Sequence, residues 1–152
     1  MSATHTAISW TDRTWNPIRG CSLVSPGCTH CYAMRQAGRF SGPGQPYEGL
    51  VRKTNQGYTW TGKVRLIEKD LDAPLRWKKP QRVFVNSMSD LFHEAVSESW
   101  LDAIFTVMAG APHHTFQILT KRPERMHAYC SQRSLPGRVQ ACRMRSGLGG
   151  DP

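Results

Sequence analysis

The sequence lacks any apolar run that approaches the ~20 residues needed by a membrane-spanning helix. Its first segment, residues 1–14, has neither an apolar stretch nor a basic n-region, so no secretory signal is expected. Both absences favour a cytoplasmic protein with no membrane partner. Because the cytoplasm is reducing, we do not expect disulfides among the cysteines.

Acidic residues are also scarce. Only 11 Asp and Glu face 20 Lys and Arg, which gives a formal net charge of +9. This excess favours polyanionic partners through non-specific attraction, and nucleic acid is one such candidate. A solvated surface that merely keeps the protein soluble explains the charge equally well. The length of 152 residues suits one globular domain that can bury a core.

Cysteine is rare, with five residues in the chain, yet three of them fall within eleven positions. Cys21, Cys28 and Cys31 form a C-x6-C-x2-C motif, with a Pro26-Gly27 turn inside the longer gap. Thiolates gathered this closely predict a metal site in a reducing compartment. Structural zinc and cubane iron–sulfur clusters both take four ligands. Three cysteines therefore leave one position for another part of the chain or for a substrate.

The hydrophobic pattern predicts alternating strands and helices. Short extended segments are expected at 8–11 and 14–18, strands at 61–67, 82–88 and 115–120, and helices at 32–40, 68–77, 97–109 and 123–129. The apolar centre of 82–88 is typical of a parallel strand covered on both faces. This order predicts an α/β fold of parallel βα-repeats. Function in such folds lies in the loops after the strands, so the cysteine loop, 86–94 and 120–122 should converge at one end of the sheet.

The character of the sequence changes at residue 130. We expect residues 1–129 to form the βα domain. Residues 130–152 lack clear periodicity and are rich in Arg, Gly and Ser. They indicate a basic, disordered tail, or a natural domain cut short and followed by unrelated sequence. The sheet would then have about four strands, too few for a barrel of about eight.

Polar side chains follow the strand predicted at 82–88. They are Ser87, Ser89, Asp90, His93 and Glu94. Their position suits a ribose- or substrate-binding edge, and we assign Ser87, Ser89 and Asp90 to cofactor binding. The alternative is local: Ser89 and Asp90 would cap neighbouring backbone groups, and His93 would be solvated.

Basic side chains follow the strand predicted at 115–120. Lys121 and Arg122 are placed to meet a carboxylate or a phosphate, and Lys121 is a candidate cofactor ligand. Ordinary exposed charges are the alternative. His113 and His114, before the same strand, are expected to be solvated rather than metal-bound. Cys130 and Cys142 are weaker candidates for a fourth metal ligand.

Four segments resemble a phage-associated family of uncharacterised proteins with a three-cysteine motif, described as radical-SAM-like. They are residues 14–21, 25–33, 84–94 and 116–126, and the likeness spans roughly residues 7–129. The three-cysteine loop also resembles the signature of radical S-adenosylmethionine enzymes. Those use C-x3-C-x2-C, whereas the first gap here has six residues. The resemblance implies a partial TIM-like barrel, incomplete at the C-terminus.

The resemblance also implies a chemistry. Three thiolates would bind three irons of a [4Fe–4S] cluster, and S-adenosylmethionine would chelate the fourth. Reduction would then release a 5′-deoxyadenosyl radical to act on an unidentified substrate. His30 is implied to pack on the adenine.

Two alternatives to this chemistry stay open. One is a zinc-stabilised nucleic-acid-binding module without catalysis, in which the three cysteines and one histidine hold the metal. The other is an inactive truncated fragment, and a partner protein that completes the fold is a related possibility.

Overall fold

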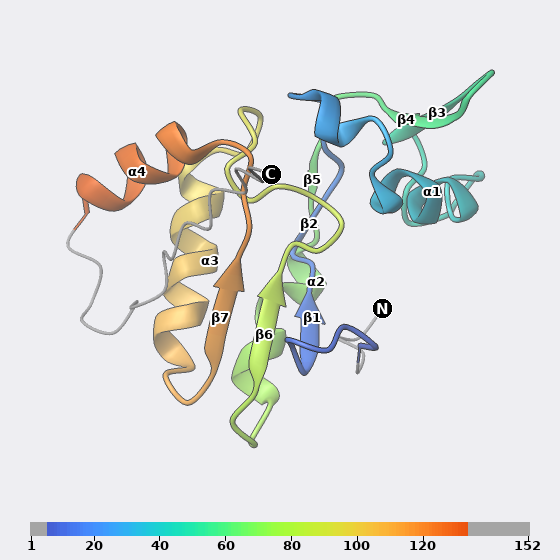
Figure 1. The fold of residues 1–152 in the computed structure, drawn as a ribbon. Helices are drawn as coiled ribbons and strands as arrows, with labels where there is room; N and C mark the ends of the chain where they lie inside the picture. Colours follow the sequence, from blue (N-terminus) through green and yellow to red (C-terminus); the bar gives the residue numbers. More distant parts are fainter. Residues whose placement is uncertain (1–5, 134–152) are drawn as a thin grey trace, which may run out of the picture.

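The centre of the molecule is a parallel sheet of three strands. The computed structural model describes residues 6–133, in which β1 (Arg13–Trp15), β6 (Arg82–Val85) and β7 (Thr115–Ile118) pair in the order β1-β6-β7 (Figure 1). Both pairings are parallel. The parallel direction predicted from the order of strands and helices is therefore confirmed for these strands.

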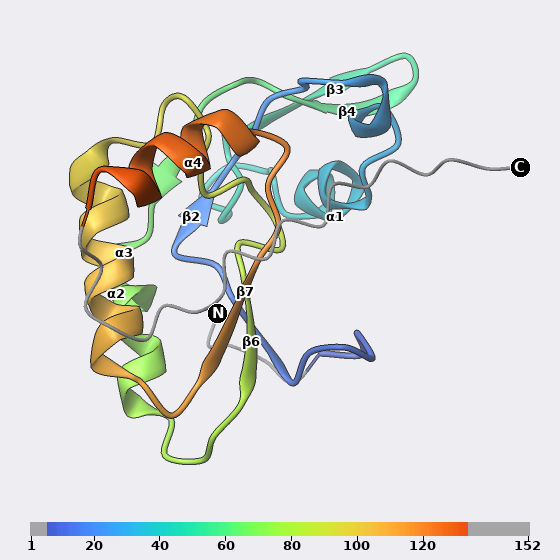
Figure 2. The same cartoon turned by 60° about the vertical axis from the view of Figure 1, so that its left-hand side comes forward.

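The helix that connects β6 to β7 packs on one face of the sheet, and the helix that follows β7 lies across the carboxyl end of that side (Figure 2). α3 (Glu98–Gly110) connects β6 to β7, and α4 (Pro123–Ser131) follows β7. Ser97 caps α3, because its hydroxyl accepts a hydrogen bond from the Trp100 N–H at 3.3 Å. α3 ends at Gly110, one residue beyond the end of the helix predicted at 97–109.

The helix predicted at 68–77 is divided into two pieces. α2 (Glu68–Leu71) is a single turn, and the 3-10 helix η2 (Ala73–Arg76) follows it. Pro74 lies in the first turn of η2, where its missing N–H costs nothing, but it could not continue α2. The prediction of one continuous helix was therefore wrong at this proline.

The central strand β6 is buried on both faces, as its apolar run predicted. Val83 and Val85 are fully buried in the main core, which includes Leu101 and Ile104 of α3. Phe84 points to the opposite face, and its ring centroid lies 4.8 Å from that of Trp10. Helices therefore cover one face, and the chain entering β1 covers the other.

A second, smaller core lies beside the sheet. The hairpin of β3 (Val51–Thr54) and β4 (Gly57–Trp60) packs on α1 (Tyr32–Arg39). Its buried residues are Ala33, Met34, Ala37, Tyr47, Leu50, Val51 and Trp60. Figures 1 and 2 both place this unit at the carboxyl end of the sheet, on the side away from α3 and α4.

The strand predicted at 61–67 was mostly wrong. Only β5 (Arg65–Leu66) is extended there, and it pairs antiparallel with β2 (Ile18–Arg19) outside the central sheet. Gly62, the second residue of the predicted strand, has a φ of +86°. This is a turn conformation, so the chain is not extended there. The hairpin 51–60 was not predicted, because its few apolar residues gave no clear alternation.

The predicted domain boundary at residue 129 falls inside α4, which continues through Ser131. The remainder of the predicted tail, including Cys142, lies outside the described residues. Among residues 6–133, no helix is both long enough and apolar enough to cross a membrane.

Candidate functional site

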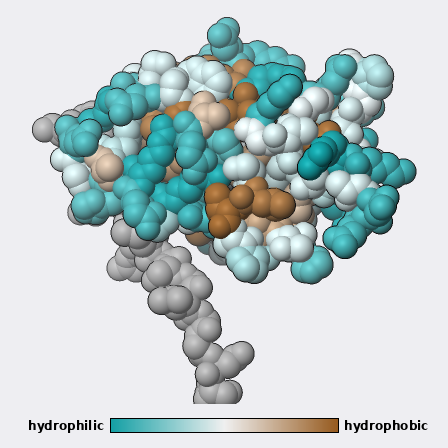
Figure 3. Space-filling model, turned by 90° about the horizontal axis from the view of Figure 1, so that it is seen from above, coloured by the Kyte–Doolittle hydropathy of each residue, from teal (hydrophilic) through white to brown (hydrophobic). Residues whose placement is uncertain are grey.

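Three polar loops meet at the carboxyl edge of the sheet, as predicted. Arg122 joins them: its guanidinium donates hydrogen bonds to Ser22 in the cysteine loop at 2.9 Å, and to Asp90 and Glu94 after β6 at 3.0 and 2.8 Å. Figure 3, which looks onto this edge, shows apolar surface exposed among hydrophilic side chains. Leu23 and Val24 of the cysteine loop contribute exposed apolar side chains.

Asp90 and Arg122 form a buried ion pair, each about 6% exposed. One Asp90 oxygen also accepts hydrogen bonds from the Phe92 N–H and the Thr120 hydroxyl, and the other from the Lys121 N–H. Such full pairing is what keeps a buried charge from destabilising the fold. The carboxylate of Asp90 is therefore already engaged within the protein, and its predicted role in binding a cofactor stays a prediction.

His93 belongs to the same network. Its Nδ1 accepts a hydrogen bond from the Ala95 N–H at 3.0 Å, so in the neutral ring Nε2 carries the proton and donates to the Ser22 hydroxyl at 2.9 Å. Burial, helped by the charge of Arg122, lowers the pKa of His93. The alternative of a solvated His93 was wrong, because the side chain is buried between the two loops.

The three cysteines of the motif are reduced and differ in environment. Cys28 is buried, and the Lys121 ammonium lies 3.3 Å from its sulfur. Burial raises the pKa of the Cys28 thiol, but hydrogen bonds from the Val24 and Ser25 backbone and from Lys121 outweigh burial and bring it to about 7. Burial raises the pKa of Cys21 above its ordinary value. Of these two cysteines, Cys28 therefore loses its proton at the lower pH.

The cysteine loop lies between the two cores. Its predicted turn is the short 3-10 helix η1 (Pro26–Cys28), and Cys21 and Cys31 pack against the core of α1 and the hairpin. Cys28 instead reaches Lys121, which follows β7. Among residues 6–133, no three His, Cys, Asp or Glu side chains are grouped to hold one metal ion.

The other predicted cofactor ligands lie on the same edge or close to it. The Ser87 hydroxyl donates to the Asn16 side chain at 3.2 Å, and the Ser89 hydroxyl to the Ile18 carbonyl at 3.0 Å. Both hydroxyls thus tie the loop after β6 to the segment after β1. His30 is exposed in the cysteine loop.

Two residues near this edge were not recognised in the sequence. Asn86, directly after β6, is buried with a φ of +57°, and its side-chain oxygen accepts from the Ile18 N–H at 3.3 Å. Ser22 accepts hydrogen bonds from both Arg122 and His93. Asn is among the few residues that tolerate a positive φ, so its place after a strand was a usable signal. Ser22 gave none.

His114, predicted to be solvated, is also buried. Its Nδ1 accepts from the Gln81 N–H at 3.2 Å, and its Nε2 lies 3.1 Å from the Pro74 carbonyl. Burial lowers its pKa. His114 therefore joins η2 to the start of β7 at the end of the sheet away from the cysteines.

Comparison with known proteins gives a family but no function. No curated protein and no solved structure shows a significant match to the chain. A family model described as a protein of unknown function, DUF5131, matches residues 5–143, which is most of the sequence. The chain therefore belongs to the DUF5131 family of proteins of unknown function.

Proposed function

We propose that the chain binds a [4Fe–4S] cluster through Cys21, Cys28 and Cys31, and S-adenosylmethionine beside it, for radical chemistry on an unidentified substrate. The observation that carries the proposal is the position of the three-cysteine loop. It lies at the carboxyl edge of a parallel sheet, with Lys121 against the Cys28 sulfur at 3.3 Å. Functional residues of parallel α/β folds gather at this edge.

The donor set fits such a cluster. The three thiols are reduced and come from one loop, and each would bind a separate iron rather than converge on one ion. The pKa of Cys28 is lowered to about 7, so its thiolate forms readily near neutral pH. The charge of Lys121 would offset part of the negative charge that three thiolates bring to a partly buried site.

The cluster, when bound and reduced, would supply one electron to the sulfonium of S-adenosylmethionine. The chain's own residues would hold and orient the site. Arg122 fixes the start of the cysteine loop through Ser22, and Lys121 neutralises the Cys28 thiolate. His30 and the hydroxyls of Ser87 and Ser89 remain the proposed contacts to the nucleoside. Residues 1–129 would represent the first part of a TIM-like barrel, and the cytoplasm is the proposed location.

Anaerobic purification and reconstitution with iron and sulfide would test the proposal. We expect a brown protein with about four iron and about four sulfide per chain, the content of one cubane cluster. Cys28→Ala should abolish retention of the cluster. S-adenosylmethionine should then bind the reconstituted chain and not the Cys28→Ala variant, measured by equilibrium dialysis.

Cys130→Ala is the matched control, since Cys130 is a half-buried cysteine outside the motif. It should keep full iron and sulfide content. A full cluster in Cys28→Ala would overturn the assignment. Stoichiometric zinc without colour would instead support the zinc-stabilised module, and loss of all metal from a chain that melts without cooperativity would support the inactive fragment.

A further inference from the structure

The positive charge of the chain is concentrated in one segment. Residues 32–66, here called the hairpin region, contain α1 and the β3–β4 hairpin. They carry six Lys and Arg and only one acidic residue, Glu48, a net +5 of the chain's +9. The six are Arg35, Arg39, Arg52, Lys53, Lys63 and Arg65. All six are exposed.

None of these six cations forms an ion pair with a carboxylate within the part of the chain that the structure describes. Other arginines behave differently: Arg76, Arg82 and Arg122 each lie within 3.0 Å of a carboxylate oxygen. A surface that only needed solubility would gain from mixed signs, which lower self-repulsion. The hairpin region instead presents positive charge without compensation.

The arrangement of α1 carries a small cost. Arg35 and Arg39 lie four residues apart on its exposed side, because Ala33, Met34, Ala37 and Gly38 face the core. Like charges at this spacing slightly destabilise a helix. Neither residue contacts an acid that would offset the cost. An external anion would do so.

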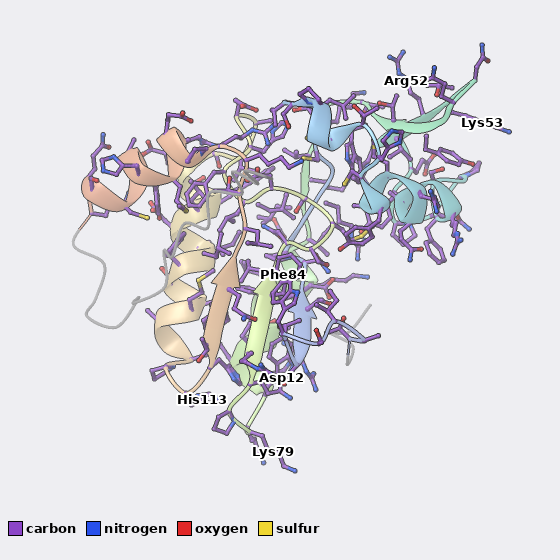
Figure 4. The ribbon with its side chains drawn as sticks, in the orientation of Figure 1. Asp12, Arg52, Lys53, Lys79, Phe84 and His113 are labelled. Atoms are coloured by element: carbon purple, nitrogen blue, oxygen red, sulfur yellow. The ribbon has the colours of Figure 1, made fainter. Side chains whose placement is uncertain are left out.

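The hairpin extends this surface away from the body of the molecule. Arg52 and Lys53 are neighbours in β3, so their side chains point to opposite faces of the ribbon, as Figure 4 shows. The tip of the hairpin is polar, because Thr54 ends β3 and Asn55 and Gln56 form the turn. A polar tip flanked by cations suits an aqueous polyanion better than a lipid interface, which takes apolar side chains.

We propose that the hairpin region binds the phosphodiester backbone of nucleic acid. Four of the six cations are arginines, whose guanidinium matches phosphate in a bidentate pair. A two-stranded ribbon is also narrow enough to lie in a nucleic-acid groove. The surface adjoins the cysteine loop, because Cys21 and Cys31 pack on the same core. The inference does not depend on the proposed cluster, because the cations of the hairpin region are positioned by the fold alone.

Fluorescence anisotropy with the full chain tests this inference. The probes are labelled 20-residue single-stranded DNA, duplex DNA and single-stranded RNA, each titrated at several salt concentrations. We expect the logarithm of the association constant to fall linearly with the logarithm of the salt concentration. Arg52→Gln with Lys53→Gln should weaken binding about tenfold or more and lower the salt slope by about two, because each substitution removes one cation that neutralises a phosphate. The three probes distinguish groove geometry from single-strand binding.

The matched control is Lys78→Gln with Lys79→Gln. These two cations are also adjacent and exposed. Figure 4 shows Lys79 at the end of the molecule opposite Arg52 and Lys53. This control should change affinity by less than about twofold. Arg35→Gln with Arg39→Gln is a second variant that should repeat the loss. Equal losses in the control, an unchanged salt slope, or binding to vesicles of anionic lipid without binding to any of the three nucleic acids would overturn the proposal. Protein with and without iron should behave alike.

Discussion

The hairpin region and the segment that follows it use charge in opposite ways. Residues 67–133, here called the sheet region, carry nine Lys and Arg and eight Asp and Glu. Several of these groups are paired, and the Asp90–Arg122 pair is almost fully buried. The hairpin region has a cation excess of five and no ion pair among its described residues. Charged side chains pair with one another in the sheet region, whereas the cations of the hairpin region have no carboxylate partner among the described residues.

The cysteine loop draws on both regions. Cys21 and Cys31 pack against the core of the hairpin region, whereas Cys28 and Ser22 contact Lys121 and Arg122 of the sheet region. The position of the thiols relative to one another therefore depends on how the two cores are held together. Changes that act on one region alone should separate these contributions.

Asp90→Asn should give the largest effect. The amide would place donors opposite the Arg122 guanidinium and the Lys121 N–H, and breaking one side of a buried pair costs about 3–5 kcal/mol. Urea unfolding followed by circular dichroism measures the loss. Asp72→Asn is the control, because its pair with Arg76 is exposed and should cost no more than about 0.5 kcal/mol. Similar losses in the two variants would show that charge is not used for cohesion in the sheet region.

Gly38→Ala should loosen the hairpin region. A Cβ at Gly38 would lie 2.3 Å from Cδ2 of the Tyr58 ring, so either the ring must shift or α1 and β4 must move apart. Overpacking of this kind costs about 1–3 kcal/mol. Hydrogen exchange should accelerate at the amides of β3 and β4 and stay unchanged in β6.

The Tyr58→Ala background provides the control for Gly38→Ala. Without the ring, the substitution should become neutral or stabilising, because alanine favours the helix. Faster exchange throughout the sheet in the single variant would mean that the two regions unfold as one unit.

Cys28 and Cys21 should differ in their reaction with iodoacetamide in the metal-free protein. The thiolate is the reactive form, so the rate at Cys28 should rise as pH increases through about 7, whereas Cys21, whose pKa is raised, should react only at higher pH. Lys121→Met removes the ammonium and should move the Cys28 profile to higher pH. Mass spectrometry of the alkylated peptides resolves each site. If the pH profile of Cys28 is the same with and without Lys121→Met, Lys121 does not set the reactivity of Cys28. The link between Cys28 and the sheet region would then be wrong.

Arg35→Glu should give the smallest effect. It places a carboxylate four residues before Arg39, in the favourable orientation for a helix, and should stabilise α1 by about 0.5 kcal/mol. Exchange of the α1 amides measures this gain, and nucleic-acid affinity should fall in the same variant. A variant that loses stability, or that binds nucleic acid as before, would argue against an uncompensated cationic surface.

Much of the sheet region was predictable from local patterns. Three local patterns each indicated one feature. The apolar run at 82–88 indicated a strand, the amphipathic stripe from Leu101 to Met108 a helix, and Ser97 the start of that helix. The hairpin was not predictable in this way. Val51 and Trp60 are buried by α1 rather than by a repeating strand pattern, so the polar residues between them gave no signal.

The sequence by itself determined the three thiols of one loop, the excess of positive charge and the parallel direction of the strands in the central sheet. These follow from composition and from short-range periodicity. Only the tertiary structure decided the environment of each thiol, because Lys121 and Cys28 are 93 positions apart in the chain. It also decided which cations are paired, since an ion pair depends on distances that folding alone creates.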